Sequence, residues 1–263
     1  MNGAGNDFVV IDNRSLRISS RAAMARKLCD RHTGVGADGL LLLEPSARAS
    51  YRMMYYNADG SYGGMCGNGG RCIAAFAVTL GASRRSHKFE ALGHVYAAEV
   101  GKKGLVKLRM KDPQGMRIGL SLPYGKDTLS VHAVDTGSPH AVVFLRRGKL
   151  ALVDVTGIGR WLREHSTFLP QGVNANFVEK IGVKSLRMRT YERGVEAETM
   201  ACGTGSVASS VLAAVTLGLR SPVAVHTRSG DILRVHFKRD GAKFFDVVLL
   251  GPVAVSFTGE ILV

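Results

Sequence analysis

The chain has 263 residues, 46% of them hydrophobic and 21% charged, proportions typical of a globular protein that can bury its own core. No apolar run approaches the roughly 18 residues of a membrane span, and no basic and apolar signal region opens the chain. These features exclude a membrane protein. We therefore expect a cytoplasmic protein that does not bind membranes.

The formal net charge of +14 would suit a nucleic-acid-binding protein or an enzyme with an anionic substrate. The basic residues are scattered, however, and only 7% of residues are aromatic, so we favour a solubilising surface over nucleic-acid binding. The four cysteines lack zinc-site spacing, and no metal is expected. In a reducing compartment they should be thiols.

The predicted elements, in chain order, fall into two similar series. The first comprises a strand at 5–10, a helix at 21–31, strands at 40–43 and 52–57, a helix from just after Cys66 to Gly81, and a hairpin that turns at Gly93. The second comprises strands at 137–142 and 187–192, a helix from just after Cys202 to Gly218, and a hairpin that turns at Gly230. Residues 34–36 of the first series also match residues 172–174 of the second.

The two series indicate an internal duplication. Both helices open on Cys-Gly-x-Gly and close on Ala-Val-Thr-Leu-Gly. We therefore predict an α+β fold of two pseudo-symmetric domains, each with a curled, mostly antiparallel sheet around a central helix, and an active site in the cleft between them. The turn-rich stretch 112–115 predicts the boundary. The N-terminal domain would be 1–114, joined by a strand at 252–263, and the C-terminal domain 115–251.

The two repeated cysteines carry the chemical prediction. A thiol at a helix N-terminus lies at the positive end of the helix dipole, which favours the thiolate, and first-turn N–H groups bind anions. Two such thiols facing one carbon would remove a proton from one side and deliver one to the other. This pattern predicts a cofactor-independent amino-acid epimerase with Cys66 and Cys202 as acid and base. Cys29 and Cys72 lack this setting and are assigned to the core.

Two glycine motifs, at 34–39 and 203–208, resemble the dinucleotide-binding fingerprint. That fingerprint requires a strand before it and a helix after it, within a parallel βαβ unit. The first motif has a predicted helix before it and a predicted strand after it. The second opens a helix, but 196–200 separates it from the preceding strand and no parallel unit follows. Nucleotide binding is therefore not expected.

Several stretches, taken together, resemble the diaminopimelate epimerase family over nearly the whole chain. They include Met-Cys-Gly-Asn-Gly-Gly-Arg at 65–71 and Glu-Thr-Met-Ala-Cys-Gly-Thr-Gly at 198–205, with others in the family's order at 3–8, 34–38, 57–60, 172–174 and 191–194. The resemblance implies interconversion of LL- and meso-2,6-diaminopimelate, a step towards lysine and peptidoglycan, without a cofactor. The expected partners are this small molecule and a second copy of the chain in a homodimer.

The resemblance also implies a role for each matching residue. Cys66 and Cys202 would be the catalytic pair, with Cys202 as proton acceptor in the LL-to-meso direction, and His140 and Glu192 would adjust their ionisation. The reacting carboxylate would lie on the backbone of Gly67, Asn68, Gly203 and Thr204. The distal end of the substrate would be held by Asn6, Asn57, Asn174 and Arg193, with contributions from Ser138 and Glu192.

Two departures from the family keep alternatives open. Ser138 stands where many members have asparagine, and Gly39 where some have glutamine. A related two-cysteine racemase of another amino acid therefore remains an alternative, as does a non-catalytic basic binding protein of the same fold. Proline-racemase-like enzymes are disfavoured because their substrates have no distal amino-acid end for Arg193 to hold.

Overall fold

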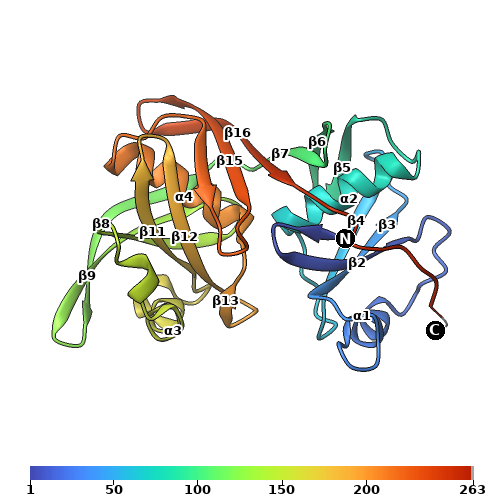
Figure 1. Cartoon of the computed structure of the whole chain (residues 1–263), viewed down its shortest axis with the longest axis horizontal. Helices are drawn as coiled ribbons and strands as arrows, with labels where there is room; N and C mark the ends of the chain where they lie inside the picture. Colours follow the sequence, from blue (N-terminus) through green and yellow to red (C-terminus); the bar gives the residue numbers. More distant parts are fainter. Residues whose placement is uncertain (262–263) are drawn as a thin grey trace. The chain divides into compact units, whose positions relative to one another are not determined.

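The computed structural model describes residues 1–261, which divide into two compact units. Unit 1 is Met1–Arg109 together with the chain from Gly251 onward, and unit 2 is Met110–Leu250 (Figure 1). Each unit combines a mixed β-sheet with two α-helices. The predicted α+β class is confirmed.

The strands of unit 1 are hydrogen-bonded in the order in which the chain makes them. The pairs β2–β3 and β4–β5 are parallel, whereas β1–β2, β3–β4, β5–β6 and β6–β7 are antiparallel. The strands are β1 (Asn2–Gly3), β2 (Asn6–Asp12), β3 (Gly39–Glu44), β4 (Arg52–Asn57), β5 (Ser86–Ala91), β6 (His94–Val100) and β7 (Leu105–Arg109); the helices are α1 (Arg21–Cys29) and α2 (Gly67–Thr79).

Unit 2 has the strand order β16-β15-β14-β12-β11-β10-β9-β8, with β13 paired to β12. Only β10–β11 and β12–β14 are parallel. The strands are β8 (Gln114–Tyr124), β9 (Asp127–Asp135), β10 (Pro139–Leu145), β11 (Asn174–Gly182), β12 (Ser185–Glu192), β13 (Ala197–Thr199), β14 (Val223–His226), β15 (Ile232–Asp240) and β16 (Lys243–Pro252); the helices are α3 (Val155–Glu164) and α4 (Gly203–Thr216), with 3-10 turns at Leu150–Leu152 and Ser166–Phe168.

The duplication is visible in the strand pairing. In unit 1, β2 and β3 are parallel with α1 between them in the chain, β3 pairs antiparallel with β4, and α2 leads to β5, which is parallel to β4. In unit 2, β10 and β11 are parallel with α3 between them, β11 pairs antiparallel with β12, and α4 leads to β14, which is parallel to β12. Phe8 lies opposite Gly39, and His140 lies opposite Asn174. Because Phe8 and His140 are equivalent positions of the repeat, their partners Gly39 and Asn174 are equivalent too. The predicted match of 172–174 with 34–36 was therefore wrong by three residues.

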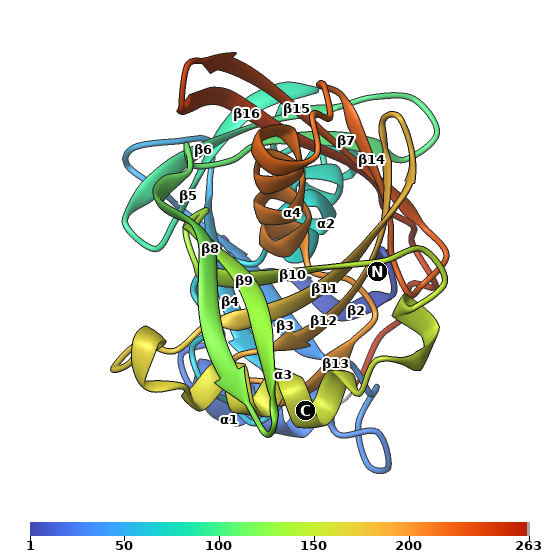
Figure 2. The ribbon, with the colours of Figure 1, turned by 90° about the vertical axis from the view of Figure 1, so that its left-hand side faces the viewer.

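The long helices begin and end where the repeated motifs predict. The glycines that follow them, Gly81 and Gly218, have φ values of 69° and 70°, as a left-handed helix terminus requires. Helix α4 packs against β9, β10, β11, β12, β14 and β15 of its own unit, and Figure 2 shows these strands around the helix. Its small residues are almost all buried, which lets the strands approach closely. The short strand β13 was not predicted.

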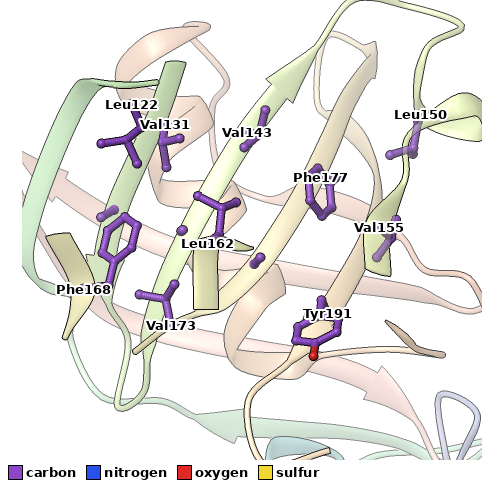
Figure 3. Close-up of a cluster of buried hydrophobic side chains, with 13 residues drawn as sticks. Leu122, Val131, Val143, Leu150, Val155, Leu162, Phe168, Val173, Phe177 and Tyr191 are labelled. Atoms are coloured by element: carbon purple, nitrogen blue, oxygen red, sulfur yellow. The ribbon is translucent and has the colours of Figure 1, made fainter. Parts of the chain in front are cut away.

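A hydrophobic core lies between α3 and the sheet of unit 2 (Figure 3). Leu162 of α3 is fully buried in the same cluster as Phe177 of β11 and Tyr191 of β12. Burial of each such side chain contributes about 1.5–3 kcal/mol. A Cβ at Gly159 would lie 2.5 Å from the Cβ of Tyr191. Glycine therefore allows α3 to approach the end of β12, which leads directly to Arg193.

Candidate functional site

Both repeated cysteines are the N-caps of the long helices. Cys66 precedes α2 with φ −115°, and its Sγ accepts a hydrogen bond from Gly69 N at 3.5 Å. Cys202 precedes α4 with φ −119°, and its Sγ accepts from Gly205 N at 3.4 Å. In each unit the sulfur thus lies against N–H groups at the positive end of a buried helix, a setting that stabilises a thiolate.

In unit 1, three of the predicted residues gather at the start of α2. The Cys66 Sγ donates to Asn6 Oδ1 at 3.8 Å, and Asn68 Nδ2 donates to the same oxygen at 3.4 Å. The buried Arg71 donates to Asn68 Oδ1 at 2.9 Å and to Gly67 O at 3.2 Å. The side chains of Asn6 and Asn68 are therefore held in fixed orientations beside the thiol.

A charged network supports Asn6 from the other side. Asn6 Nδ2 donates to Asp38 Oδ2, and Arg31 donates to Asp7 through both terminal nitrogens at 3.0 Å and to Asp38 at 2.9 Å. Burial opposes ionisation of Asp7, but the bonds from Arg31 and Asp38 outweigh it and lower its pKa. Burial raises the pKa of Asp38, and the neighbouring Asp7 adds to the rise. Sequence reasoning missed this network, although Asp38 closes the motif at 34–38.

Asn57 lies at the end of β4 and is oriented by its own strand. Tyr55 Oη donates to Asn57 Oδ1 at 2.7 Å, and Asn57 Nδ2 donates to Ser61 Oγ at 2.9 Å. The Tyr55 ring fits between two glycines, because a Cβ would lie 2.6 Å from it at Gly39 and 2.3 Å at Gly63. A Cβ at Gly39 would also lie 2.6 Å from the backbone oxygen of Tyr56, so no larger residue fits at this position unless both the Tyr55 ring and the backbone of β4 shift.

In unit 2, the first turn of α4 is tied to the sheet. Thr136 Oγ1 donates to Thr204 O at 3.1 Å, and the Thr204 hydroxyl lies 3.5 Å from Cys202 Sγ. Ser206 Oγ donates to Cys202 O at 2.8 Å. Cys202 itself is 5% exposed. The first turn of α4, which carries the Cys202 thiol, is therefore attached to the sheet through Thr136.

Three residues predicted to hold the distal end of a substrate meet around one amide. Asn174 Nδ2 donates to Ser138 Oγ at 2.8 Å, and Asn174 Oδ1 accepts from Arg193 N at 3.0 Å. The Arg193 guanidinium donates to Gln171 O at 2.9 Å. Glu192, just before it, accepts a hydrogen bond from Thr199 Oγ1 at 2.6 Å. The hydroxyl of Ser138 is thus part of this cluster.

His140 is buried in unit 2 with two polar residues that sequence reasoning missed. Asn176 Nδ2 lies 3.1 Å from His140 Nδ1, and Thr190 Oγ1 donates to Asn176 Oδ1 at 3.1 Å. Burial, with a smaller contribution from the charge of Arg193, lowers the pKa of His140 to about 3. His140 is therefore neutral at physiological pH. The alternation of apolar and polar residues along Asn-Ala-Asn-Phe on β11 is the signal that would have drawn attention to Asn176.

The buried His140 should make stability depend on pH. Its folded-state pKa of about 3 lies below the ordinary 6.5, so the unfolded chain binds more protons between these values. Its contribution is complete above about pH 6.5 and is lost as the pH falls. Between about pH 7 and 5 we expect a loss of about 2 kcal/mol, measured by urea denaturation. His140→Gln should remove this part of the pH dependence. The exposed His94→Gln should retain it, and equal slopes in the two variants would contradict the assignment.

The two remaining cysteines differ from the capping pair. Cys29 and Cys72 are buried in unit 1, and burial raises the pKa of each thiol to about 12. Both are therefore protonated at neutral pH, in agreement with their assignment to the core. Within residues 1–261, no three or more histidine, cysteine, aspartate or glutamate side chains cluster as metal ligands would. No helix in that range is long and apolar enough to span a membrane.

Known proteins resemble this chain over nearly its whole length. The family model described as diaminopimelate epimerase matches residues 1–115 and 132–255. A diaminopimelate epimerase of Chlorobaculum tepidum is 42% identical over 99% of both chains, and one of Aquifex aeolicus is 38% identical over 99% of this chain and 96% of its own.

Solved structures share the fold at low sequence identity. A phenazine biosynthesis protein of the PhzF family from Bacillus anthracis has a TM-score of 0.72 at 16% identity, covering 96% of this chain and 92% of its own. A hydroxyproline epimerase from Agrobacterium vitis has a TM-score of 0.65 at 15% identity, covering 91% and 80%. With matches to the family model and to close relatives over nearly its full length, the chain belongs to the diaminopimelate epimerase family.

Proposed function

We propose that the protein interconverts LL- and meso-2,6-diaminopimelate by moving a proton at one α-carbon, with Cys66 and Cys202 as the acid–base pair and without a cofactor. The observation that carries the proposal is the repeated N-cap cysteine, one in each unit, with its sulfur on the N–H of the third residue that follows. The substrate is inferred from the related diaminopimelate epimerases of Chlorobaculum tepidum and Aquifex aeolicus.

The proposed direction follows the resemblance to the family, by which the Cys202 thiolate takes the α-proton in the LL-to-meso reaction. Gly205 N and the Thr204 hydroxyl lie where they can stabilise the charge of that thiolate. The Cys66 thiol delivers a proton to the opposite face. The substrate α-carboxylate lies on the first-turn N–H groups at Gly67 and Asn68 and at Gly203 and Thr204. Helix geometry leaves these groups outside the intrahelical ladder, where they can stabilise the developing negative charge.

Arg193 is proposed to hold the distal carboxylate of the substrate. A guanidinium can donate two parallel hydrogen bonds to a carboxylate, whereas an ammonium acts as a point charge. Arg193→Lys should therefore raise KM for diaminopimelate by roughly tenfold, the effect of losing about 1.4 kcal/mol, and should change kcat less. Steady-state kinetics measures this, with Arg146→Lys as the control. A fall in kcat at unchanged KM would contradict the binding role.

Assembly and location form a second part of the proposal. We propose a cytoplasmic location, where the buried thiols of Cys29 and Cys72 would stay reduced. Strand β8 is an 11-residue edge strand of unit 2 with exposed side chains such as Ile118, and such an edge can pair with a second copy. We propose a homodimer, to be tested by light scattering after size-exclusion chromatography. A single monomer mass at micromolar concentration would overturn it.

The substrate assignment is tested with a panel of L-amino acids under reducing conditions. Chiral chromatography would follow LL-diaminopimelate beside L-lysine, L-glutamate and L-proline. Conversion of diaminopimelate alone supports the proposal. Conversion of another amino acid instead would move the assignment to a related racemase, a possibility that Ser138 and Gly39 motivate. No conversion of any of them by folded, reduced protein would leave a non-catalytic binding protein.

A further inference from the structure

Asn176 lies at the centre of a buried polar cluster in the sheet of unit 2. It is 0% exposed and lies directly opposite Thr190 across the β11–β12 pair. Its Oδ1 would be only 2.3 Å from a Cβ at Gly205, whose N–H caps Cys202 Sγ. Asn176 therefore packs on the turn of α4 that holds this thiol, and on its other side it contacts His140.

The neighbours of Asn176 determine which way its amide points. The Nδ2 side lies 3.0 Å from Ala141 O and 3.3 Å from Asn174 O, and the Oδ1 side accepts from Thr190 Oγ1. Carbonyl oxygens can only accept hydrogen bonds. Rotation of the amide by 180° would set its oxygen against two other carbonyl oxygens, which is strongly unfavourable in a buried site. The NH₂ group must therefore face these carbonyls.

The same NH₂ group faces His140 Nδ1 at 3.1 Å. An amide NH₂ group is a donor only, so a hydrogen on Nδ1 would point at a group that cannot accept it, and Nδ1 therefore carries no hydrogen. A neutral imidazole then carries its proton on Nε2. His140 is 1% exposed, and within residues 1–261 its Nε2 atom has no hydrogen-bond partner. The ring thus presents an N–H donor that the described residues do not use.

We propose that Asn176 is a positioning residue that keeps His140 neutral with its proton on Nε2, so that His140 acts at this site as a hydrogen-bond donor and never as a base. The role of His140 in catalysis rests on the proposed function. An imidazolium would place N–H against N–H at Asn176, and the charge of Arg193, the ionisable group acting on the ring, opposes it as well. A neutral donor can stabilise negative charge on substrate or thiolate without taking the proton that the two cysteines exchange.

The direct test is nitrogen NMR on the whole protein labelled with ¹⁵N-histidine. Long-range ¹H–¹⁵N correlations report which ring nitrogen carries the proton, and His140→Gln identifies the His140 signals by their loss. We expect an unprotonated Nδ1 and a protonated Nε2 from about pH 5 to 8, the range in which an ordinary histidine titrates. A proton on Nδ1, or titration to imidazolium within this range, would overturn the proposal.

A paired substitution tests the part played by Asn176. Asn176→Asp replaces the donor with an acceptor, and should move a proton onto Nδ1, add an ionisation to the pH profile of kcat, and lower kcat by roughly tenfold or more. Asn13→Asp makes the same change at a buried asparagine of unit 1. It should lower stability while leaving the His140 tautomer and the shape of the pH profile unchanged.

The two tests separate this proposal from the proposed function. A folded Asn176→Asp variant that keeps the wild-type tautomer would overturn the role of Asn176. If that variant does not fold, the His140 tautomer measured in the wild-type protein still tests the proposal, and a proton on Nδ1 would overturn it. If the tautomer is as expected but the wild-type protein converts no diaminopimelate, the assignment of Asn176 stands and the proposed function fails.

Discussion

Cys66→Ala and Cys202→Ala should each lower kcat for diaminopimelate epimerisation by at least about a thousandfold, within the range that a positioned acid or base contributes. Each variant removes one of the two groups proposed to exchange the α-proton. The other two thiols lie elsewhere on their helices, Cys29 at the C-terminal end of α1 and Cys72 within α2. Circular dichroism should show both variants folded. Steady-state assays under reducing conditions measure the loss.

Cys29→Ala is the matched control. Cys29 is 2% exposed, and burial raises the pKa of its thiol to about 12, so it is protonated and inaccessible at neutral pH. Its loss should cost some stability but leave kcat within about twofold, a difference of only a few tenths of a kcal/mol in barrier. Residual activity above about 10% in Cys66→Ala or Cys202→Ala would contradict the two-cysteine mechanism.

Gly205→Ala should damage both stability and activity. An added Cβ would lie 2.3 Å from Asn176 Oδ1 and 3.2 Å from both Cβ and Sγ of Cys202. The sheet-bound Asn176 cannot move without breaking its own hydrogen bonds, so the turn that caps Cys202 must shift. We expect a loss of about 1–3 kcal/mol in the free energy of unfolding. We also expect a fall in kcat of roughly a hundredfold from the misplaced thiol.

Gly69→Ala makes the same change at the equivalent position of unit 1. Its Cβ would meet only the end of the Leu41 side chain, at 3.1 Å, and Cys66 Cβ at 3.6 Å. Alanine favours a helix over glycine by about 1 kcal/mol, which offsets the contact. The variant should therefore have nearly wild-type stability. Urea denaturation and steady-state kinetics compare Gly69→Ala with Gly205→Ala. Equal losses of unfolding free energy and of kcat in the two variants would contradict the different surroundings of Cys66 and Cys202.

The sequence predicted the parts of the fold that depend on local pattern. The capping cysteines, the helices that follow them and the turns at Gly93 and Gly230 are set by residues close together in the chain, and the repeat gave each of them a second, independent occurrence. The register was harder. The match of 34–36 with 172–174 relied on residue identity alone. Strand pairing instead makes Gly39, which lies opposite Asn57, the position equivalent to Asn174.

The supporting residues could not be predicted because they act over long sequence separations. Asn6 is held by Asp38, 32 residues away, and His140 by Asn176, 36 residues away. Such contacts depend on which strands become neighbours and which side chains share a face. The sequence placed His140 among the functional residues but gave no sign that an amide donor fixes its tautomer. It flagged Gly39 as a departure without revealing that the Tyr55 ring occupies the space beside it.

The central claim is that two different cysteines handle the departing and the arriving proton. It is tested by converting LL-diaminopimelate in deuterium oxide and analysing both isomers by NMR and mass spectrometry at low conversion. If Cys202 removes the proton and Cys66 delivers another, the new meso product carries deuterium at the inverted carbon while the remaining LL substrate keeps its proton. Product that retains the original α-proton would show that a single group serves both faces, and would contradict the account.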